Sequence, residues 1–144
     1  MIRPVRPTDA ARTLEIWRAA VHATHDFLAP AHLREIDDLV SHHLADMVDW
    51  VAADEEDRPL GFMATTGAHI DALFIDPAVH GRGLGRAFVE FMAARHPAIT
   101  VDVNEQNGRA VGFYEQLGFR RVGRSPTDDQ GRPYPLLHLR RDSV

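Results

Sequence analysis

Residues 73–86 read LFIDPAVHGRGLGR, and the architecture follows most directly from this segment. The apolar run Leu73-Phe74-Ile75 predicts a strand, and the glycines that follow predict a turn. After the turn, apolar residues recur at helical spacing and predict a new helix; they are Leu84, Ala87, Phe88, Phe91 and Met92. A strand, a glycine turn and a helix start together form an anion site, because the first N–H groups of a helix lack partners within it.

The glycine turn is suited to a phosphate or pyrophosphate. Gly81, Gly83 and Gly85 carry no Cβ that would keep the backbone away from a bulky anion. Arg82 and Arg86 add cations that can form charge-assisted hydrogen bonds. The dipole of the following helix adds partial positive charge at the same point. The segment therefore predicts a phosphate-binding loop.

Two familiar phosphate loops do not fit this turn. A Walker loop ends in Gly-Lys-Ser/Thr, and the chain contains no lysine. A dinucleotide fingerprint would account for Asp102, about twenty residues downstream, as the acid that binds a ribose. In that fingerprint, however, the glycines follow the strand directly with the spacing G-x-G-x-x-G. Here residues 76–80 separate the strand from the glycines. The position of the third glycine is held by Arg86, and Gly85 lies one place too early.

A second segment, residues 99–119, predicts a strand followed by a short capped helix. Asn107 is placed to cap the helix, because its side chain can accept a hydrogen bond from an N–H two or three residues on. One helical face carries Ala110, Phe113, Tyr114 and Leu117. Gly118 followed by apolar Phe119 is the pattern of a Schellman stop, in which glycine takes a left-handed conformation.

The glycine turn and the pattern N-x-x-A-x-x-F-Y-x-x-x-G-F over 107–119 resemble the Gcn5-related N-acetyltransferase (GNAT) superfamily. The resemblance runs from about His69 to Phe119. Within the superfamily the chain is similar to the small bacterial acetyltransferases of the YjaB type, over residues 23–28, 71–77, 103–107 and 133–137. One position departs from the pattern: His80 stands where the family's turn usually opens with Gln or Arg.

The expected fold class is α/β (α+β), a GNAT fold with a mixed central sheet of about seven strands flanked by four helices. It is expected to form a single domain over residues 1–144 in the order β-α-α-β-β-β-α-β-α-β-β. Periodicity places strands at 2–6, 50–53, 60–66, 69–75, 99–103, 120–124 and 136–140. Helices are predicted after Thr8 as a cap, after Pro30, from Leu84 and after Asn107. This order places helices on both faces of the sheet.

The resemblance implies an N-acetyltransferase that takes acetyl-CoA as cosubstrate. Backbone groups of Leu73, Phe74 and Ile75 would pair with the pantetheine arm like an added strand. The pyrophosphate would lie over the turn, held by Gly81, Arg82, Gly83, Leu84, Gly85 and Arg86. The remaining cofactor-binding residues are expected to be Asn104, Asn107, Phe113 and Tyr114.

Direct transfer to an amine requires an acid, an oxyanion donor and a base. Tyr114 matches the family tyrosine that approaches the thioester sulfur and is assigned as general acid. A backbone N–H around Phe74 would bind the oxyanion, and Asn104 would orient the site or bind the pantetheine arm. The base stays open: Asp71, acting directly or through a water, is preferred over Glu105.

The acceptor is a primary amine, either a small molecule or a protein lysine or N-terminus. Acceptor-binding residues are expected at His25, Asp26 and Phe27, in the connection between the first two helices, and His22 is placed there with them. His69 and Asp71 share one face of their strand by period two and complete the expected acceptor site.

Composition narrows the function classes. The chain has no cysteine, which excludes disulfides, thiolate zinc sites and a cysteine acyl-enzyme. The formal net charge of −5 disfavours non-specific nucleic-acid binding. No apolar run is long enough to span a membrane and the start lacks a signal peptide's apolar core, so a cytoplasmic protein is expected. We expect no metal, no membrane partner, and a monomer or homodimer.

Two other functions remain as alternatives. A non-catalytic domain could bind acetyl-CoA as a sensor, although the retained Tyr114 counts against it. A non-haem iron enzyme could use His69, Asp71 and His138 as a facial triad. That chemistry usually sits on an all-β double-sheet scaffold, which four helical segments disfavour.

Overall fold

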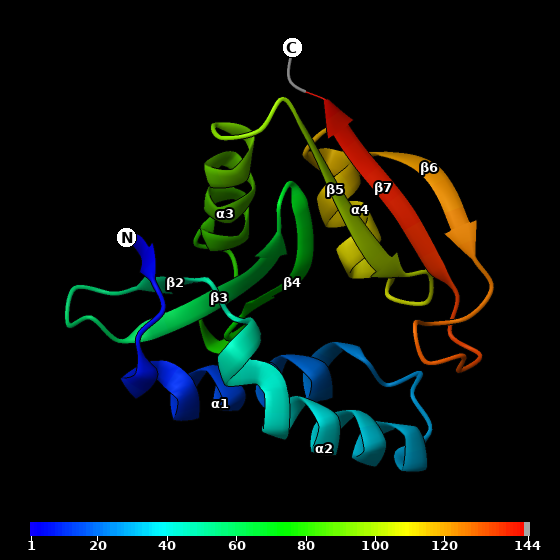
Figure 1. The fold of residues 1–144 in the computed structure, drawn as a ribbon, viewed down its shortest axis with the longest axis horizontal. Coiled ribbons are helices and arrows are strands. Elements are labelled where there is room, and N and C mark those ends of the chain that lie inside the picture. The colour runs from blue at the N-terminus through cyan, green and yellow to red at the C-terminus, as the bar shows by residue number, and fades with distance from the viewer. Residues whose placement is uncertain (143–144) are drawn as a thin grey trace. The chain divides into compact units, whose positions relative to one another are not determined.

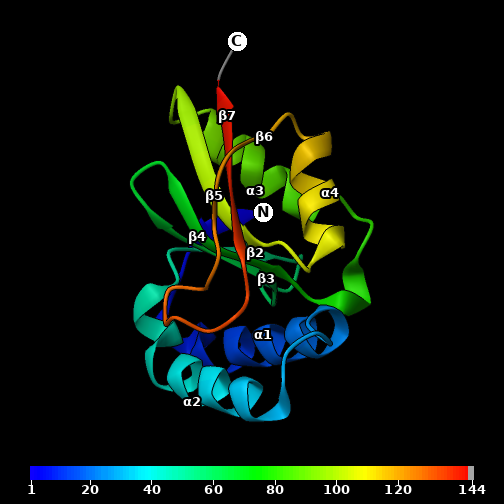
Figure 2. The same ribbon diagram turned by 90° about the vertical axis from the view of Figure 1, so that its right-hand side faces the viewer.

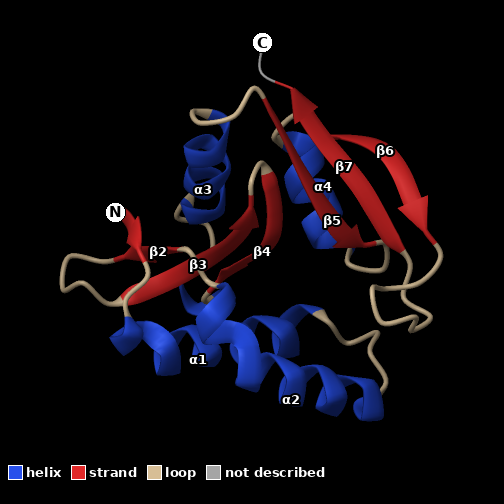
Figure 3. Cartoon of the chain, in the orientation of Figure 1, coloured by secondary structure: helices blue, strands red, loops and turns tan. Residues whose placement is uncertain are grey.

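The computed structural model describes residues 1–142 and contains seven strands and four α-helices within them (Figures 1 and 3). The strands are β1 (Ile2–Pro4), β2 (Trp50–Ala53), β3 (Pro59–Thr66), β4 (His69–Ile75), β5 (Ala98–Asn104), β6 (Arg120–Ser125) and β7 (Leu136–Asp142). The α-helices are α1 (Ala10–Thr24), α2 (Pro30–Met47), α3 (Leu84–Ala93) and α4 (Gly108–Gln116). Short 3₁₀ helices, η1 (Pro7–Asp9) and η2 (Pro77–Val79), precede α1 and follow β4. The predicted element order is confirmed.

Hydrogen bonds order the strands as β1-β2-β3-β4-β5-β7-β6. Pairing is antiparallel between β1 and β2, β2 and β3, β5 and β7, and β6 and β7. The β4–β5 pair is parallel and matches His69 with Thr100 and Ile70 with Val101. The sheet is therefore mixed, as predicted. Pro4 lies in β1 at one end of the order, where a residue without an N–H donor is tolerated.

The contacts divide the chain into two compact units, which we describe separately. The N-terminal unit comprises Met1–Thr65 and Ala72–Phe88. The C-terminal unit comprises Thr66–Asp71 and the chain from Val89 onward. The division falls within β4 and within α3. That the chain forms a single domain stays a prediction.

The N-terminal unit is built around one apolar core, which lies between two packed helices and two strands. Figure 1 shows α1 and α2 side by side, and the two helices are in contact. Their apolar stripes meet strands β2 and β3 in a cluster of Ile16, Trp17, Val21, Leu44, Val48, Val51, Ala53 and Phe62. Burial of such side chains contributes about 1.5–3 kcal/mol each, so this cluster fixes both helices.

The C-terminal unit covers one face of its strands with α4, which contacts β5 (Figure 2). Alternate residues along β5 and β7 are buried: Ile99, Val101, Val103, Leu137 and Leu139. Asp102 and His138 occupy intervening positions, which by strand alternation point to the opposite face, and about a third of each side chain is exposed.

The predicted end of α4 is confirmed. Gly118 has φ of +92°, and its N–H donates to the Glu115 carbonyl at 3.0 Å. The Phe119 N–H donates to the Tyr114 carbonyl at 3.1 Å. These two bonds form a Schellman motif and satisfy carbonyls that the helix end leaves unpaired.

The predicted N-terminal boundaries are wrong in two places. The first strand ends at Pro4 instead of residue 6. Thr8 does not cap α1; it lies inside η1, and Asp9 precedes the helix. Asp9 instead accepts a hydrogen bond from the Arg6 N–H at 2.7 Å and pairs with buried Arg3 at 2.8 and 3.0 Å. The Arg3 guanidinium lowers the pKa of the Asp9 carboxyl, and this pair fixes the local backbone in place of the threonine.

Across residues 1–142, no helix combines the length and the apolar character that crossing a bilayer requires.

Candidate active site

The glycine turn lies between η2 and α3 in the N-terminal unit. Gly81 and Gly83 have φ of +84° and +77°, and a Cβ built on either would meet no atom within 4 Å. Both glycines are therefore required by conformation and border open space. At the start of α3, the Ala87 N–H donates a hydrogen bond to the Gly83 carbonyl at 3.0 Å. The N–H groups just before it are the donors that an anion can use.

A cap fixes the approach from β4 to the turn. The Asp76 carboxylate accepts from the Ala78 N–H at 3.0 Å and from Arg12 Nη2 at 2.6 Å. The Ala78 hydrogen bond is the main reason that the pKa of Asp76 is lowered, with the Arg12 hydrogen bond adding to it. The Asp76 N–H donates to the Leu60 carbonyl at 2.8 Å. The start of the turn is thereby tied to both β3 and α1. Arg82 and Arg86 are exposed.

The end of β4 lies against a glycine that the sequence pattern did not single out. A Cβ built on Gly61 of β3 would stand 2.6 Å from Ile75 Cδ1 and 3.0 Å from the Phe74 carbonyl oxygen. Real Cβ atoms essentially never stand as close as 2.6 Å to another atom, so the end of the Ile75 side chain would have to move, and 3.0 Å from a backbone oxygen is tighter than most real Cβ contacts. Glycine at residue 61 therefore lets β4 lie this close to β3. Leu73, Phe74 and Ile75 are all partly buried.

The connection between α1 and α2 brings its histidine to β4 within the same unit. The His25 ring lies 6.5 Å from the Phe74 ring and 5.4 Å from the Phe27 ring, measured between centroids. Its Nδ1 lies 2.7 Å from the Thr24 hydroxyl. Burial lowers the pKa of His25, and the nearby Asp26 charge opposes the shift. Asp26 is exposed and Phe27 is partly buried.

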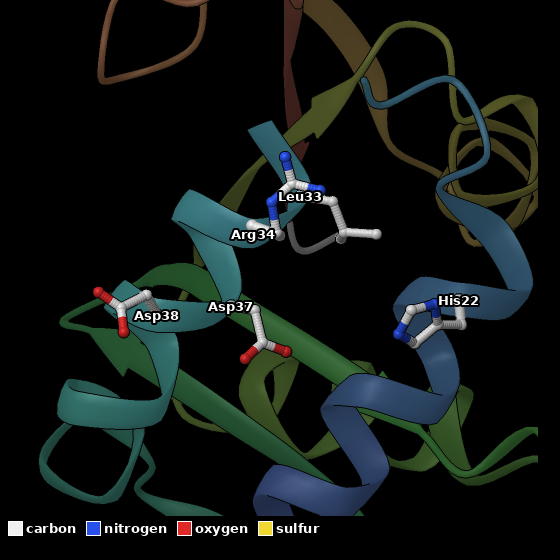
Figure 4. Close-up of a pocket in the computed structure, with 5 residues that line it drawn as sticks. All are labelled: His22, Leu33, Arg34, Asp37 and Asp38. Atoms are coloured by element: carbon white, nitrogen blue, oxygen red, sulfur yellow. The ribbon is translucent and has the colours of Figure 1, made fainter. Parts of the chain in front are cut away.

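His22 was expected in the same connection and is not there. It belongs to the last turn of α1, which extends to Thr24. There it lines a cavity of about 410 Å³ with Leu33, Arg34, Asp37 and Asp38 of α2 (Figure 4). Asp37 accepts two hydrogen bonds from Arg18, each at 3.0 Å. Apart from His22, which was placed with the acceptor-binding residues, the lining contains none of the residues predicted to bind cofactor or acceptor.

Tyr114 is buried in the C-terminal unit. Only 6% of it is exposed. Its ring makes edge contacts with Phe113 and Phe119, at centroid distances of 4.9 and 5.2 Å. Burial strongly raises the pKa of the phenol. Because its pKa is raised, the phenol is protonated at neutral pH. Within residues 1–142 its hydroxyl has no hydrogen-bond partner, so its proton is available to a ligand.

Asn104 and Asn107 flank the turn from β5 to α4. Asn104 is the last residue of β5, paired with Leu136 of β7, and its carbonyl accepts from the Asn107 N–H at 3.0 Å. The Asn107 side chain accepts from the Ala110 N–H at 3.2 Å. Its predicted capping role is confirmed, and its predicted contact with the cofactor stays a prediction.

The two candidate bases lie in different surroundings. Glu105 accepts from Arg124 Nη2 at 2.8 Å and from Arg121 at 3.4 Å, and the Arg124 hydrogen bond lowers the pKa of Glu105. A carboxylate held ionised by arginines is a weak base. Asp71 accepts a hydrogen bond from the Thr66 hydroxyl at 2.5 Å, and about a third of its side chain is exposed.

His69 joins a row of polar side chains on the strands of the C-terminal unit. Its Nδ1 lies 2.7 Å from the Thr100 hydroxyl, and its Nε2 lies 3.5 Å from Asp102 and 3.9 Å from Asp71. Asp102 also meets His138 Nδ1 at 2.6 Å.

No group of three or more His, Asp or Glu side chains among residues 1–142 is arranged to hold a metal ion. The proposed facial triad of His69, Asp71 and His138 is therefore not formed.

The predicted site residues fall into two sets. The N-terminal unit holds the glycine turn, the end of β4 and the His25 connection. The C-terminal unit holds His69, Asp71, Asn104, Asn107, Phe113 and Tyr114. Each set is consistent with a part of the predicted chemistry: anion and arm binding in the first, proton donation in the second.

Comparisons with known proteins identify the family of the chain. A family model described as an acetyltransferase (GNAT) domain matches residues 19–134. Peptidyl-lysine N-acetyltransferase YjaB of Salmonella typhimurium (strain LT2) is 50% identical over 138 residues, which covers 96% of this chain and 95% of that protein. Peptidyl-lysine N-acetyltransferase YiaC of Escherichia coli (strain K12) is 30% identical over 135 residues, 92% of each.

A solved structure shows the same fold. The solution structure of apo-form YjaB from Escherichia coli matches with a TM-score of 0.94 and 47% sequence identity, covering 100% of this chain and 98% of that one. The predicted superfamily, the likeness to the YjaB type and the predicted fold class are confirmed.

Proposed function

This chain is an acetyltransferase of the GNAT family, and we propose that it transfers the acetyl group of acetyl-CoA directly to the side-chain amine of a protein lysine. The observation that carries the donor assignment is the open turn at Gly81 and Gly83, directly before α3. Peptidyl-lysine acetyltransfer is the activity named for two relatives that align over more than nine-tenths of this chain. The same class of acceptor is proposed here.

The N-terminal unit supplies the donor-binding groups of the proposal. The pyrophosphate would accept from N–H groups at the start of α3, with Arg82 and Arg86 beside it. The exposed His80 contributes less than the usual Gln or Arg, so backbone donors carry more of the binding. Leu73, Phe74 and Ile75 would pair with the pantetheine arm as a strand pairs with its neighbour.

Tyr114 is proposed as the general acid. The departing thiolate needs a proton, and the buried phenol holds one at neutral pH because its pKa is raised. Its hydroxyl has no hydrogen-bond partner within residues 1–142, which leaves its proton for a ligand atom. Asn104, the last residue of β5, is proposed to orient the reacting groups of the site.

The acceptor amine must lose a proton before it attacks, because a free lysine has a pKa of about 10.4. Asp71 is proposed as the base, directly or through a water, since its carboxylate is partly exposed and its partners within residues 1–142 are the Thr66 hydroxyl and the His69 ring, not arginines. Glu105 is the weaker candidate because of its two arginine partners. His25, Asp26, Phe27 and His69 are proposed to contact the acceptor.

The composition of the chain removes two sources of background from the experiment that tests this proposal. The protein has no cysteine, so any thiol released from acetyl-CoA can be measured with a disulfide reagent without background from the enzyme. It also has no lysine, so every acetyl-lysine found by mass spectrometry belongs to the acceptor. The acceptors are an N-terminally blocked lysine peptide, its Lys→Arg counterpart and a small polyamine.

We expect thiol release and acetyl-lysine with the lysine peptide and neither with the Lys→Arg peptide. Turnover of the polyamine alone would refute the protein-lysine assignment while leaving acetyl transfer intact. Calorimetric binding of acetyl-CoA without turnover on a broad amine panel would favour the sensor alternative.

A further inference from the structure

Three strands of the C-terminal unit place an aspartate, a histidine and a serine in a continuous hydrogen-bonded row. Asp102 of β5 and His138 of β7 are directly paired in the antiparallel ladder, and Asp102 Oδ1 lies 2.6 Å from His138 Nδ1. On the other side of the ring, His138 Nε2 lies 2.7 Å from the Ser125 hydroxyl oxygen of β6. We propose that these residues form a Ser-His-Asp acyl-transfer centre that cleaves small carboxylic esters.

Strand register explains why the row forms. Gly123 of β6 is the residue paired with His138, and a Cβ there would stand 3.3 Å from His138 Cδ2. The imidazole therefore lies over the bare glycine. Ser125 is two residues further along β6 and so points to the same face, within reach of the far ring nitrogen.

The hydrogen-bond chemistry fixes the direction of the row. A carboxylate only accepts hydrogen bonds, so His138 Nδ1 carries the hydrogen that lies between it and Asp102. In the neutral ring Nε2 is then the acceptor, and it receives the hydroxyl hydrogen of Ser125. A nucleophile bonded to a base, with the base oriented by a third group, is the arrangement by which catalytic triads are recognised on unrelated folds.

The proposed reaction balances with water alone. Ser125 Oγ attacks the ester carbonyl carbon while its proton passes to His138 Nε2. The ester C–O bond breaks, the alcohol leaves with that proton, and the acyl group stays on Ser125. Water then attacks the acyl carbon while His138 Nε2 takes a proton from it, the bond between the acyl carbon and Ser125 Oγ breaks, and His138 returns the proton to Oγ. The products are the carboxylic acid and free Ser125.

The centre is open to a substrate. About a third of the Asp102 and His138 side chains is exposed, and Ser125 is partly exposed. Strand β6 is the last in the sheet order, and an edge strand carries backbone N–H groups on its outer side that face no neighbouring strand. Such groups are donors of the kind that an oxyanion requires.

A fluorophosphonate probe tests the centre directly, because it phosphonylates activated serines with loss of fluoride. The protein is incubated with the probe in the absence of acetyl-CoA, and intact mass and peptide mapping locate the adduct. The same preparation is assayed for hydrolysis of p-nitrophenyl acetate. The matched control is Ser41→Ala, which removes an exposed serine hydroxyl of α2 that donates to the Asp38 carbonyl.

We expect one adduct, on Ser125, which Ser125→Ala abolishes and Ser41→Ala leaves unchanged. His138→Ala should slow both labelling and ester hydrolysis about 10²-fold, the usual contribution of a positioned proton acceptor. An adduct elsewhere, no adduct, or labelling that is insensitive to His138→Ala would overturn the proposal. The assay omits acetyl-CoA, so its outcome is independent of the proposed acetyl transfer.

Discussion

Gly61 of β3 and Ile75 of β4 are in such close contact that a methyl group on Gly61 would stand 2.6 Å from Ile75 Cδ1. The same methyl group would stand 3.0 Å from the Phe74 carbonyl oxygen and 3.4 Å from the Phe88 ring. Gly61 therefore sets the position of the segment proposed to bind the pantetheine arm. It also contacts the helix that follows the phosphate turn.

We predict that Gly61→Ala lowers the free energy of unfolding by about 1–3 kcal/mol, as overpacking of a core does. The matched control is Gly112→Ala on α4, where a Cβ meets no atom within 4 Å. That change should raise stability by about 0.5–1 kcal/mol, because alanine is the better helix former. Chemical denaturation measures both variants, and a stable Gly61→Ala protein would contradict the packing described.

Tyr114→Phe should lower kcat by about 10²-fold or more, the scale expected for loss of a proton donor. Acetyl-CoA affinity, measured by calorimetry, should hardly change. Stability should also hold, because the phenol hydroxyl has no hydrogen-bond partner within residues 1–142 and the ring contacts with Phe113 and Phe119 remain. If the variant keeps its full kcat, Tyr114 is not the acid.

Gly83→Asp should abolish acetyl-CoA binding. The new side chain places a negative charge at the proposed phosphate site and forces φ of +77° on a residue that disfavours it. Gly131→Asp is the control, since Gly131 has φ of +76° and equally open surroundings in the β6–β7 connection. Both variants carry the same backbone strain, so calorimetry that finds equal affinity for the two would refute the assigned turn.

His25 should make stability fall as the solution is acidified. Burial lowers its pKa in the folded protein, so the unfolded chain binds the proton more readily. The stabilisation is complete above the unfolded-state pKa of about 6.5 and is lost as the pH falls through the lower folded value. Thermal unfolding between pH 8 and pH 5 should show a smaller loss for His25→Phe than for the parent, and parallel curves would contradict this account.

The elements whose backbone is fixed by their own residues are the ones that can be predicted from the sequence. The Asn107 cap and the Schellman motif at Gly118 depend on residues within one helix and its flanks, and both were predicted. The prediction that Thr8 caps α1 is wrong, because Asp9 precedes the helix and is held by Arg3 of β1. His22 was misplaced for a related reason, since α1 extends through Thr24 before the chain turns.

The amino-acid sequence by itself determined the family, the order of the elements and the glycine turn, because left-handed backbone, helix caps and apolar periodicity are local properties of neighbouring residues. Tertiary structure alone decided which carboxylates are held by arginine, that Gly61 makes room for Ile75, and that Ser125, His138 and Asp102 form one row. Those relationships depend on strand register and packing, and they join residues that no spacing in the sequence connects.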